Sequence, residues 1–88
     1  MKAVVLYETG SANMDQIMAV YPRHKALIDE FAARGDLLAV GAFANRDGSM
    51  GVFKNREAAE AFVARDPFML EGFVGKCTIK DWNEILMG

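Results

Sequence analysis

The chain has few residues with which to bind a metal ion or cross-link itself. Its 88 residues include one cysteine and one histidine. A single cysteine cannot form an internal disulfide, so we expect a reducing compartment, the cytoplasm. One histidine and one cysteine give no spacing typical of a metal site, and the sequence has no glycine-rich phosphate loop and no nucleophile elbow. We therefore expect neither a metal ion nor any other cofactor.

Clustered positive charge and long apolar runs are also lacking. Ten Lys and Arg residues are scattered among twelve Asp and Glu residues, which gives a formal net charge of -2. Scattered basic residues argue against a nucleic acid or an anionic membrane as the partner. No apolar stretch approaches the roughly 20 residues of a membrane span. The first residues become polar too soon for a signal peptide. The sequence thus predicts no nucleic-acid partner and no membrane association.

What the chain does have is a large apolar fraction for its size. At 88 residues we expect a single domain that covers residues 1–88. A chain of this length buries only about 60% of the surface that its unfolded form exposes, yet 52% of these residues are hydrophobic. Spare apolar surface on a small domain favours a partner subunit.

The hydrophobic pattern predicts four strands and two main helices. Strands are expected at residues 2–8, 36–43, 49–54 and 73–80, and helices at residues 22–34 and 56–65. A turn at residues 45–48, with the Asp-Gly chemistry typical of hairpins, joins the second and third strands. Residues 14–20 are also predicted to be helical. They either continue into the main helix through a kink at Tyr21-Pro22 or form a separate turn.

The helix at residues 22–34 carries the only histidine. Pro22 suits a first helical turn, and Gly35 suits the left-handed position just past the end. His24 lies on or beside the stripe that faces the core, near the expected N-terminus of the helix. The rest of this stripe recurs at helical spacing after His24: Leu27, Ile28, Phe31 and Ala32.

The predicted element order is that of a ferredoxin-like βαββαβ sandwich, an α+β fold in which both helices cover one face of the sheet. The strands at residues 2–8 and 36–43 are apolar on both faces, so a second copy of the sheet is the simplest cover for the other face. Gly41 marks a bulge or a close approach within its strand. The apolar tail at residues 81–88 is expected to pack against the protein, through Trp82, Ile85 and Leu86.

Several short motifs occur together in a characteristic order. Arg23-His24 opens the first long helix, and Gly35-Asp36-Leu37-Leu38 with Gly41 follows. The later motifs are Gly48-Ser49 on the hairpin, Glu57-Ala58-Ala59 on the second helix, Asp66-Pro67-Phe68, and Gly72. Over nearly its whole length the chain resembles the YCII-related family. The resemblance implies a dimeric α+β barrel with a ferredoxin-like protomer, and hence a homodimer. The stretch from Gly10 to Pro22 is longer and richer in Met than the family pattern, which bears on the pocket entrance.

The resemblance also implies an active site. Its histidine and aspartate correspond to His24 and Asp66, in a small pocket between the sheet and the helices, with Arg23 and Phe68 beside them. Some members of the family are associated with elimination from chlorinated aromatic compounds. A His-Asp dyad, with lyase or hydrolytic chemistry on a small-molecule ligand, is what the resemblance predicts here.

The residues themselves leave alternatives open. A histidine of pKa about 6.5 can take or give a proton at neutral pH, and a carboxylate on its second nitrogen orients it. His24 could equally be a partly buried residue bonded to a backbone carbonyl. Asp66 before proline is an ordinary helix cap, and Asp36, at the far end of the helix, is the rival partner for His24.

Two further residues are candidates for substrate binding. Arg23 could clamp a carboxylate or phenolate on a substrate, or it could be a solvated helix residue. Gly41 could leave room for a ligand, or it could serve only the geometry of its strand.

Three functions are consistent with these observations. The first is a cofactor-free enzyme that uses His24 as general acid or base on a small, aromatic substrate. The second is a small-molecule-binding or accessory module in which the same pocket does no chemistry. The third is a cofactor-independent monooxygenase of the related barrel type.

Overall fold

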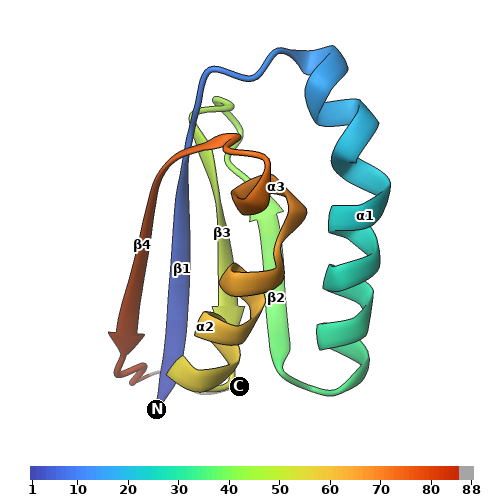
Figure 1. The fold of residues 1–88 in the computed structure, drawn as a ribbon. Helices are drawn as coiled ribbons and strands as arrows, with labels where there is room; N and C mark the ends of the chain where they lie inside the picture. The colour runs from blue at the N-terminus through green and yellow to red at the C-terminus, as the bar shows by residue number, and fades with distance from the viewer. Residues whose placement is uncertain (86–88) are drawn as a thin grey trace.

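The computed structural model describes residues 1–85. A four-stranded antiparallel sheet in the order β2-β3-β1-β4 carries the helices on one face (Figure 1). This architecture confirms the predicted α+β, ferredoxin-like fold. The elements, in chain order, are β1 (Lys2–Thr9), α1 (Met14–Ala33), β2 (Leu37–Ala42), β3 (Gly48–Phe53), α2 (Arg56–Arg65), α3 (Pro67–Leu70) and β4 (Val74–Trp82).

Strand β1 lies between β3 and β4 and is apolar on both faces, as predicted. Ala3, Val5 and Tyr7 are buried beneath the helices, while Val4 and Leu6 on the other face are partly exposed. The helices complete the core with a few large side chains, chiefly Leu27, Phe31 and Phe62. This arrangement places the inner face of β1, including Tyr7, directly against the helical layer.

Helix α1 is longer than the sequence indicated. Asn13 caps it, and a reciprocal hydrogen bond with Gln16 completes a capping box. Of the two arrangements left open for residues 14–20, the continuous one is found: Pro22 lies inside a single helix, on its exposed side, and the main helix does not begin there. His24 is therefore in the middle of the helix rather than near its N-terminus. Gly35 ends the helix in the predicted left-handed conformation, with φ +79°.

One member of the predicted core-facing stripe of α1 is misplaced. Ala32 is exposed, whereas Leu27 and Phe31 are buried and Ile28 is partly buried. Ala32 is eight residues beyond His24, so a helix of 3.6 residues per turn carries it about 80° away from the direction of His24. The inward face of α1 is accordingly narrower than the sequence predicted.

Strand β2 was predicted at residues 36–43 and spans Leu37–Ala42. Its side chains do not alternate regularly between the two faces of the sheet. Its pairing with β3 shifts between Leu37 and Ala39, so the bulge lies there and not at Gly41. Gly41 pairs in register with Met50. Because paired residues share a face of the sheet, the shift places both Leu37 and Val40 on the helical side.

The predicted hairpin between β2 and β3 is present, but its turn differs from the expected Asp-Gly geometry. The left-handed residue is Arg46, with φ +63°, and Gly48 belongs to β3. A Cβ atom at Gly48 would overlap the backbone carbonyl of Tyr7. Glycine at this position therefore permits the close approach of β3 to β1 beside Tyr7.

The C-terminal tail was predicted to pack against the domain. Within the single chain this prediction is wrong for two of its apolar residues. Trp82, at the end of β4, is 44% exposed, and Ile85 is 87% exposed. Leu86 lies outside the described residues. Across residues 1–85, no helix combines the length and the apolar character needed to cross a membrane.

Candidate active site

Asp66 joins α2 to α3 and is completely buried. It caps α3: its Oδ1 accepts a hydrogen bond from the backbone N–H of Phe68 at 3.1 Å, and Pro67 follows at the first helical position. An aspartate at the cap and a proline just inside the helix are the residues that this local geometry favours. The predicted capping role is confirmed, and it fixes the carboxylate beneath α1.

Two side chains from distant elements also bond this carboxylate. Nδ1 of His24, from α1, lies 2.7 Å from Oδ1, and the hydroxyl of Tyr7, from β1, donates to Oδ2 at 2.7 Å. A buried carboxylate is costly unless donors replace the water that it loses. The Tyr7 hydroxyl, His24 Nδ1–H and the Phe68 N–H together supply three such donors.

Tyr7 is held as a neutral donor. Its burial, and then the hydrogen bond and charge of Asp66, raise the pKa of the phenol far above its usual range. The hydroxyl therefore stays protonated at neutral pH and donates a hydrogen bond to the carboxylate.

His24 is held in one orientation by an aromatic neighbour. Its ring stacks on Phe68 with centroids 4.0 Å apart and planes 11° from parallel, and Phe62 meets it edge-on at 6.3 Å. Only 12% of the imidazole side chain is exposed. Because Nδ1 is committed to the acceptor Asp66, it carries the proton and Nε2 is the nitrogen left to react. Within residues 1–85 no protein group bonds Nε2.

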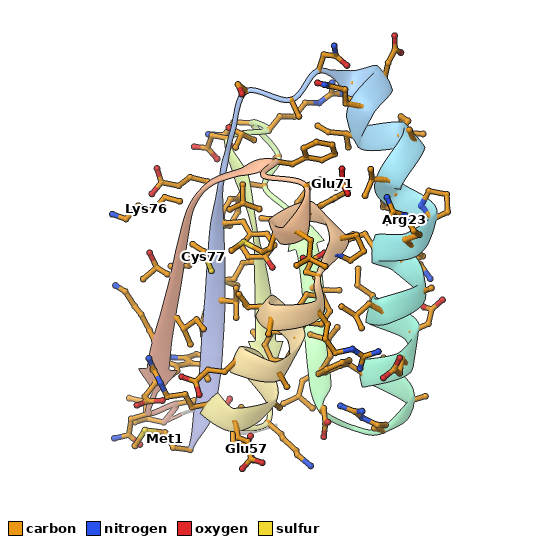
Figure 2. The ribbon with its side chains drawn as sticks, in the orientation of Figure 1. Met1, Arg23, Glu57, Glu71, Lys76 and Cys77 are labelled. Atoms are coloured by element: carbon orange, nitrogen blue, oxygen red, sulfur yellow. The ribbon has the colours of Figure 1, made fainter. Side chains whose placement is uncertain are left out.

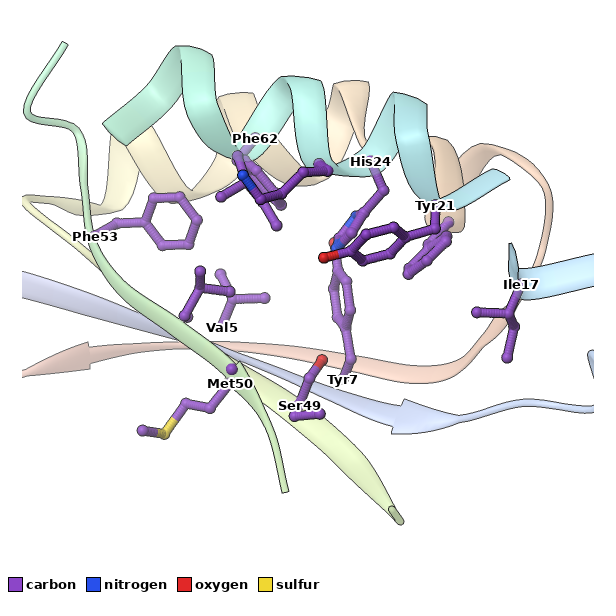
Figure 3. Close-up of a pocket in the computed structure, with 16 residues that line it drawn as sticks. Val5, Tyr7, Ile17, Tyr21, His24, Ser49, Met50, Phe53 and Phe62 are labelled. Carbon is purple, nitrogen blue, oxygen red and sulfur yellow. The ribbon is translucent and has the colours of Figure 1, made fainter. Parts of the chain in front are cut away.

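An apolar cavity of about 450 Å³ lies between α1 and the sheet. Figure 3 shows the side chains of His24 and Tyr7 reaching toward each other at one side of it, from the helix and from the sheet. Its polar side chains are few, and aromatic rings make up much of the wall. The lining residues are Val5, Tyr7, Ile17, Tyr21, His24, Lys25, Ile28, Val40, Gly41, Ala42, Ser49, Met50, Gly51, Phe53, Phe62 and Phe68.

The structure brings most of the sequence-predicted site residues together. His24, Phe68 and Gly41 line the cavity, and Asp66 lies behind His24. Arg23 does not join them. Its side chain is 62% exposed, and its guanidinium lies 4.0 Å from the carboxylate of Glu71, outside the cavity (Figure 2). Successive residues of a helix point about 100° apart, so the position next to His24 faces elsewhere.

Asp36, the rival partner for His24, lies at the other end of α1. Its carboxylate is 2.7 Å from Lys54 Nζ and 2.8 Å from Arg34 Nη2. The hydrogen bond from Lys54, followed by that from Arg34, holds the pKa of Asp36 below its usual range. Asp36 is therefore engaged in a separate ion-pair cluster, and the carboxylate bonded to His24 is Asp66.

Neither a metal nor a reactive thiol is indicated at this site. No group of three or more potential metal ligands was found among residues 1–85. Cys77, on β4 (Figure 2), is partly buried, and that burial, with the charge of Asp66, raises the pKa of its thiol. A raised pKa leaves less of the nucleophilic thiolate.

Sequence reasoning assigned no functional role to Tyr7, Tyr21 or Lys25. For Tyr7 a signal was available: a tyrosine on the core-facing side of a strand needs a partner for its buried hydroxyl. Tyr21 lies three residues before His24 and Lys25 one residue after it. No sequence signal tells whether such positions line a cavity or lie on the solvent-exposed face of the helix. The continuity of α1 through Pro22, one of the two alternatives that the sequence left open, is what brings Tyr21 to the cavity.

Comparison with solved structures supports the fold. The 5-chloro-2-hydroxyhydroquinone dehydrochlorinase of Burkholderia phenoliruptrix AC1100, in complex with 2,5-dihydroxybenzoquinone, is similar, with a TM-score of 0.75 and 17% identity over 94% of each chain. A cofactor-independent oxygenase of Streptomyces nogalater has a TM-score of 0.49 and 15% identity, over 97% of this chain and 94% of the other.

Comparison with curated proteins and with family models completes the assignment. No curated protein matches the chain. The model of the YCII-related domain matches residues 1–83, nearly the full length. The chain therefore belongs to the YCII-related domain family.

Proposed function

We propose that this protein is a cofactor-free enzyme in which His24 acts as general base and then general acid on a small aromatic substrate. The observation that carries the proposal is the buried Tyr7–Asp66–His24 network at the wall of an apolar cavity. A carboxylate on Nδ1 fixes the tautomer and stabilises the imidazolium that forms when Nε2 accepts a proton.

The cavity indicates the class of substrate. A volume of about 450 Å³ is within the ordinary range for small-molecule sites, which combine apolar walls with a few polar groups. Flat aromatic side chains, among them Phe53, Phe62 and Phe68, suit an aromatic ring. A phenolic or hydroxylated ring would match both these walls and the few polar groups.

Two reactions use this arrangement. In an elimination, Nε2 of His24 takes a proton from the substrate, the electrons of the broken bond form a double bond, and a leaving group such as chloride departs with its electron pair. In the hydrolysis of an ester, Nε2 takes a proton from a water molecule whose oxygen bonds to the acyl carbon. The acyl–oxygen bond then breaks, and the phenolate leaves with its electron pair and takes the proton from the imidazolium. In either case Asp66 compensates the positive charge on the imidazole.

The test is a turnover assay with a matched pair of variants. Chlorinated hydroxyhydroquinones report elimination through chloride release, and phenyl esters report hydrolysis. We expect His24→Gln to lower kcat by 10²- to 10⁴-fold, the usual contribution of a general base. Asp36→Asn, in the separate ion-pair cluster, should leave kcat within about twofold.

Calorimetric titration of the same compounds completes this test. Binding to wild type and His24→Gln alike, with turnover in neither, would support a non-catalytic binding module and refute the enzyme proposal. Turnover that His24→Gln retains would also refute it.

We also propose that the protein is a homodimer that covers the outer face of its sheet. Helices α1, α2 and α3 lie on the opposite face (Figure 1), while Val4 pairs with Val52 and Leu6 with Met50 on the outer face. Met50 is 39% exposed. An uncovered apolar sheet face is typical of an interface, and two-fold pairing of identical faces is the commonest arrangement.

The dimer is tested by light scattering. We expect twice the chain mass of 9.7 kDa for wild type at micromolar concentration. Leu6→Glu should yield the monomer mass, because a charge would be buried at the centre of the interface. Glu8→Gln, at the exposed end of β1, should leave the dimer intact. A wild-type particle of one chain mass would refute the proposal.

A further inference from the structure

We propose that Tyr7 is a positioning residue of this site: its hydroxyl holds the second oxygen of Asp66 and thereby sets how strongly the carboxylate attracts the proton on His24. The inference deepens the proposed function and rests on it for its catalytic meaning. It can nevertheless be measured on the protein without any substrate.

The two oxygens of Asp66 are bonded differently. Oδ1 accepts from His24 Nδ1 and from the backbone N–H of Phe68, at 2.7 and 3.1 Å. Oδ2 accepts from the Tyr7 hydroxyl at 2.7 Å, and the described chain offers it no second donor. The Phe68 bond is a helix cap and would exist for any capping aspartate. The Tyr7 bond joins residues 59 positions apart, so only the tertiary fold creates it.

Hydrogen bonds to a carboxylate act in competition. Each donor withdraws charge from the oxygens, so a strong bond from Tyr7 leaves less negative charge to hold the proton of the imidazolium. Loss of the Tyr7 hydroxyl would leave Asp66 with a higher proton affinity and a stronger pull on His24. The pair would then take up its proton at a higher pH, and His24 would be a poorer donor in the second half of a reaction cycle.

The titratable groups around the Asp66–His24 pair come from three elements. His24 lies on α1, Tyr7 on β1 and Cys77 on β4, and Asp66 itself precedes α3. Tyr21, also on α1, has its ring 6.1 Å from that of His24. The cations next to the pair in sequence face other carboxylates: Lys25 bonds Asp29, Arg65 bonds Glu30, and Arg23 lies 4.0 Å from Glu71. Cys77 faces Asp66 only as a thiol of raised pKa. The neutral phenol of Tyr7 is therefore the donor that is available to tune the pair.

The chain offers a clean readout because it contains a single histidine. Its imidazole gives one set of ring-proton signals, whose midpoint can be followed by NMR titration. We expect Tyr7→Phe to raise the midpoint of the pair by roughly one pH unit, a tenfold change in proton affinity. Tyr21→Phe makes the same chemical change at the chain's other tyrosine, which has no bond to Asp66, and should leave the midpoint within about 0.2 units.

A second substitution should shift the titration midpoint in the opposite direction while keeping the phenol ring of Tyr7. Replacement of tyrosine by 3-fluorotyrosine in the Tyr21→Phe background labels Tyr7 alone and makes its hydroxyl a stronger donor. We expect this protein to lower the midpoint, opposite to Tyr7→Phe. A purely structural role for Tyr7 does not predict opposite shifts. This experiment also decides the question if Tyr7→Phe fails to fold.

The outcomes separate this inference from the proposed function. Opposite shifts in the two proteins would support the positioning role, whether or not a substrate has been found. An unchanged midpoint in the fluorotyrosine protein would refute the positioning role, even if His24→Gln abolishes turnover. Shifts of the same sign in both proteins would refute it too.

Discussion

Asp66 and Asp36 both follow a helix and both lie in the interior, but their partners differ in kind. Asp36, with 13% of its side chain exposed, is paired with Lys54 and Arg34, which stay positively charged at neutral pH. Asp66, with none exposed, is bonded by a phenol, an amide and an imidazole. Fixed cations neutralise a carboxylate permanently, whereas titratable partners leave its charge available to a proton that moves. The first arrangement stabilises a fold, and the second also suits proton transfer.

The same contrast appears in what surrounds each aspartate. The cations of Asp36 are about half exposed, so water can replace the carboxylate if it is removed. The donors around Asp66 are buried or partly buried beside an apolar cavity. The free energy of unfolding therefore depends more on Asp66 than on Asp36, although Asp36 is paired with more positively charged side chains.

The largest expected effect follows directly. Asp66→Ala leaves three donors without their acceptor and removes the cap of α3, which together should lower the free energy of unfolding by about 3–5 kcal/mol. Asp36→Ala should cost clearly less, because its exposed cations return to water. Urea denaturation followed by circular dichroism measures both. Equal losses in the two variants would show that the burial of Asp66 does not have the consequence argued here.

An intermediate effect is expected on the stability that the ion pairs of Asp36 provide, which should be lost at low pH. The hydrogen bonds from Lys54 and Arg34 lower the pKa of Asp36 in the folded protein. A lowered folded-state pKa gives stability that is present above the unfolded value, about 4, and is lost as the pH falls through the folded value.

The difference in unfolding free energy between wild type and Asp36→Asn should therefore be constant from pH 7 to about pH 5 and should shrink below about pH 4. Urea denaturation of both proteins at pH 3, 5 and 7 measures it. High salt should reduce the difference at pH 7, because the cations are partly exposed. A difference that persists unchanged at pH 3 would contradict the ion-pair explanation.

The sequence predicted the fold well because the fold depends on local patterns. The hydrophobic pattern identified β1, and helical spacing identified α2, whose bounds at residues 56–65 are confirmed. The sequence left a choice open at Pro22 and missed the position of the bulge in β2, because distant contacts or a balance of energies decide these features. The capping box at Asn13 and the long apolar face of α1 outweigh the single hydrogen bond lost at Pro22. The bulge at Leu37/Ala39 depends on pairing with β3, which no local pattern records.

The site was harder to predict than the fold. From residues alone His24 and Asp66 were two unremarkable positions 42 apart, and the resemblance to a family suggested the pairing. The partner of Tyr7 could not be found at all, since a hydroxyl on a core-facing strand position does not say which acceptor the fold will bring to it. Arg23 shows the converse: adjacency in sequence to His24 did not place it at the cavity.

The smallest expected effect is on the pH dependence of stability and concerns Tyr7, the neutral hydrogen-bond donor to Asp66. Burial, and then the bond to Asp66, raise the pKa of Tyr7 in the folded protein. A raised folded-state pKa gives stability that is fully present below the unfolded value, about 10, and is lost as the pH rises above it, because only the unfolded chain releases the proton.

Tyr7→Phe should accordingly be less stable than wild type by about 1 kcal/mol at pH 8. The gap should narrow by up to about 1.4 kcal/mol per pH unit above pH 10. Paired denaturation curves at pH 8, 9.5 and 10.5 measure this difference, which cancels the alkaline destabilisation that both proteins share. Asp36→Asn should show no such narrowing, because its partners are cations and not the phenol. A constant gap for Tyr7→Phe up to pH 10.5 would mean that the phenol ionises equally in the folded and unfolded chains, and that Asp66 is not held by a buried neutral donor.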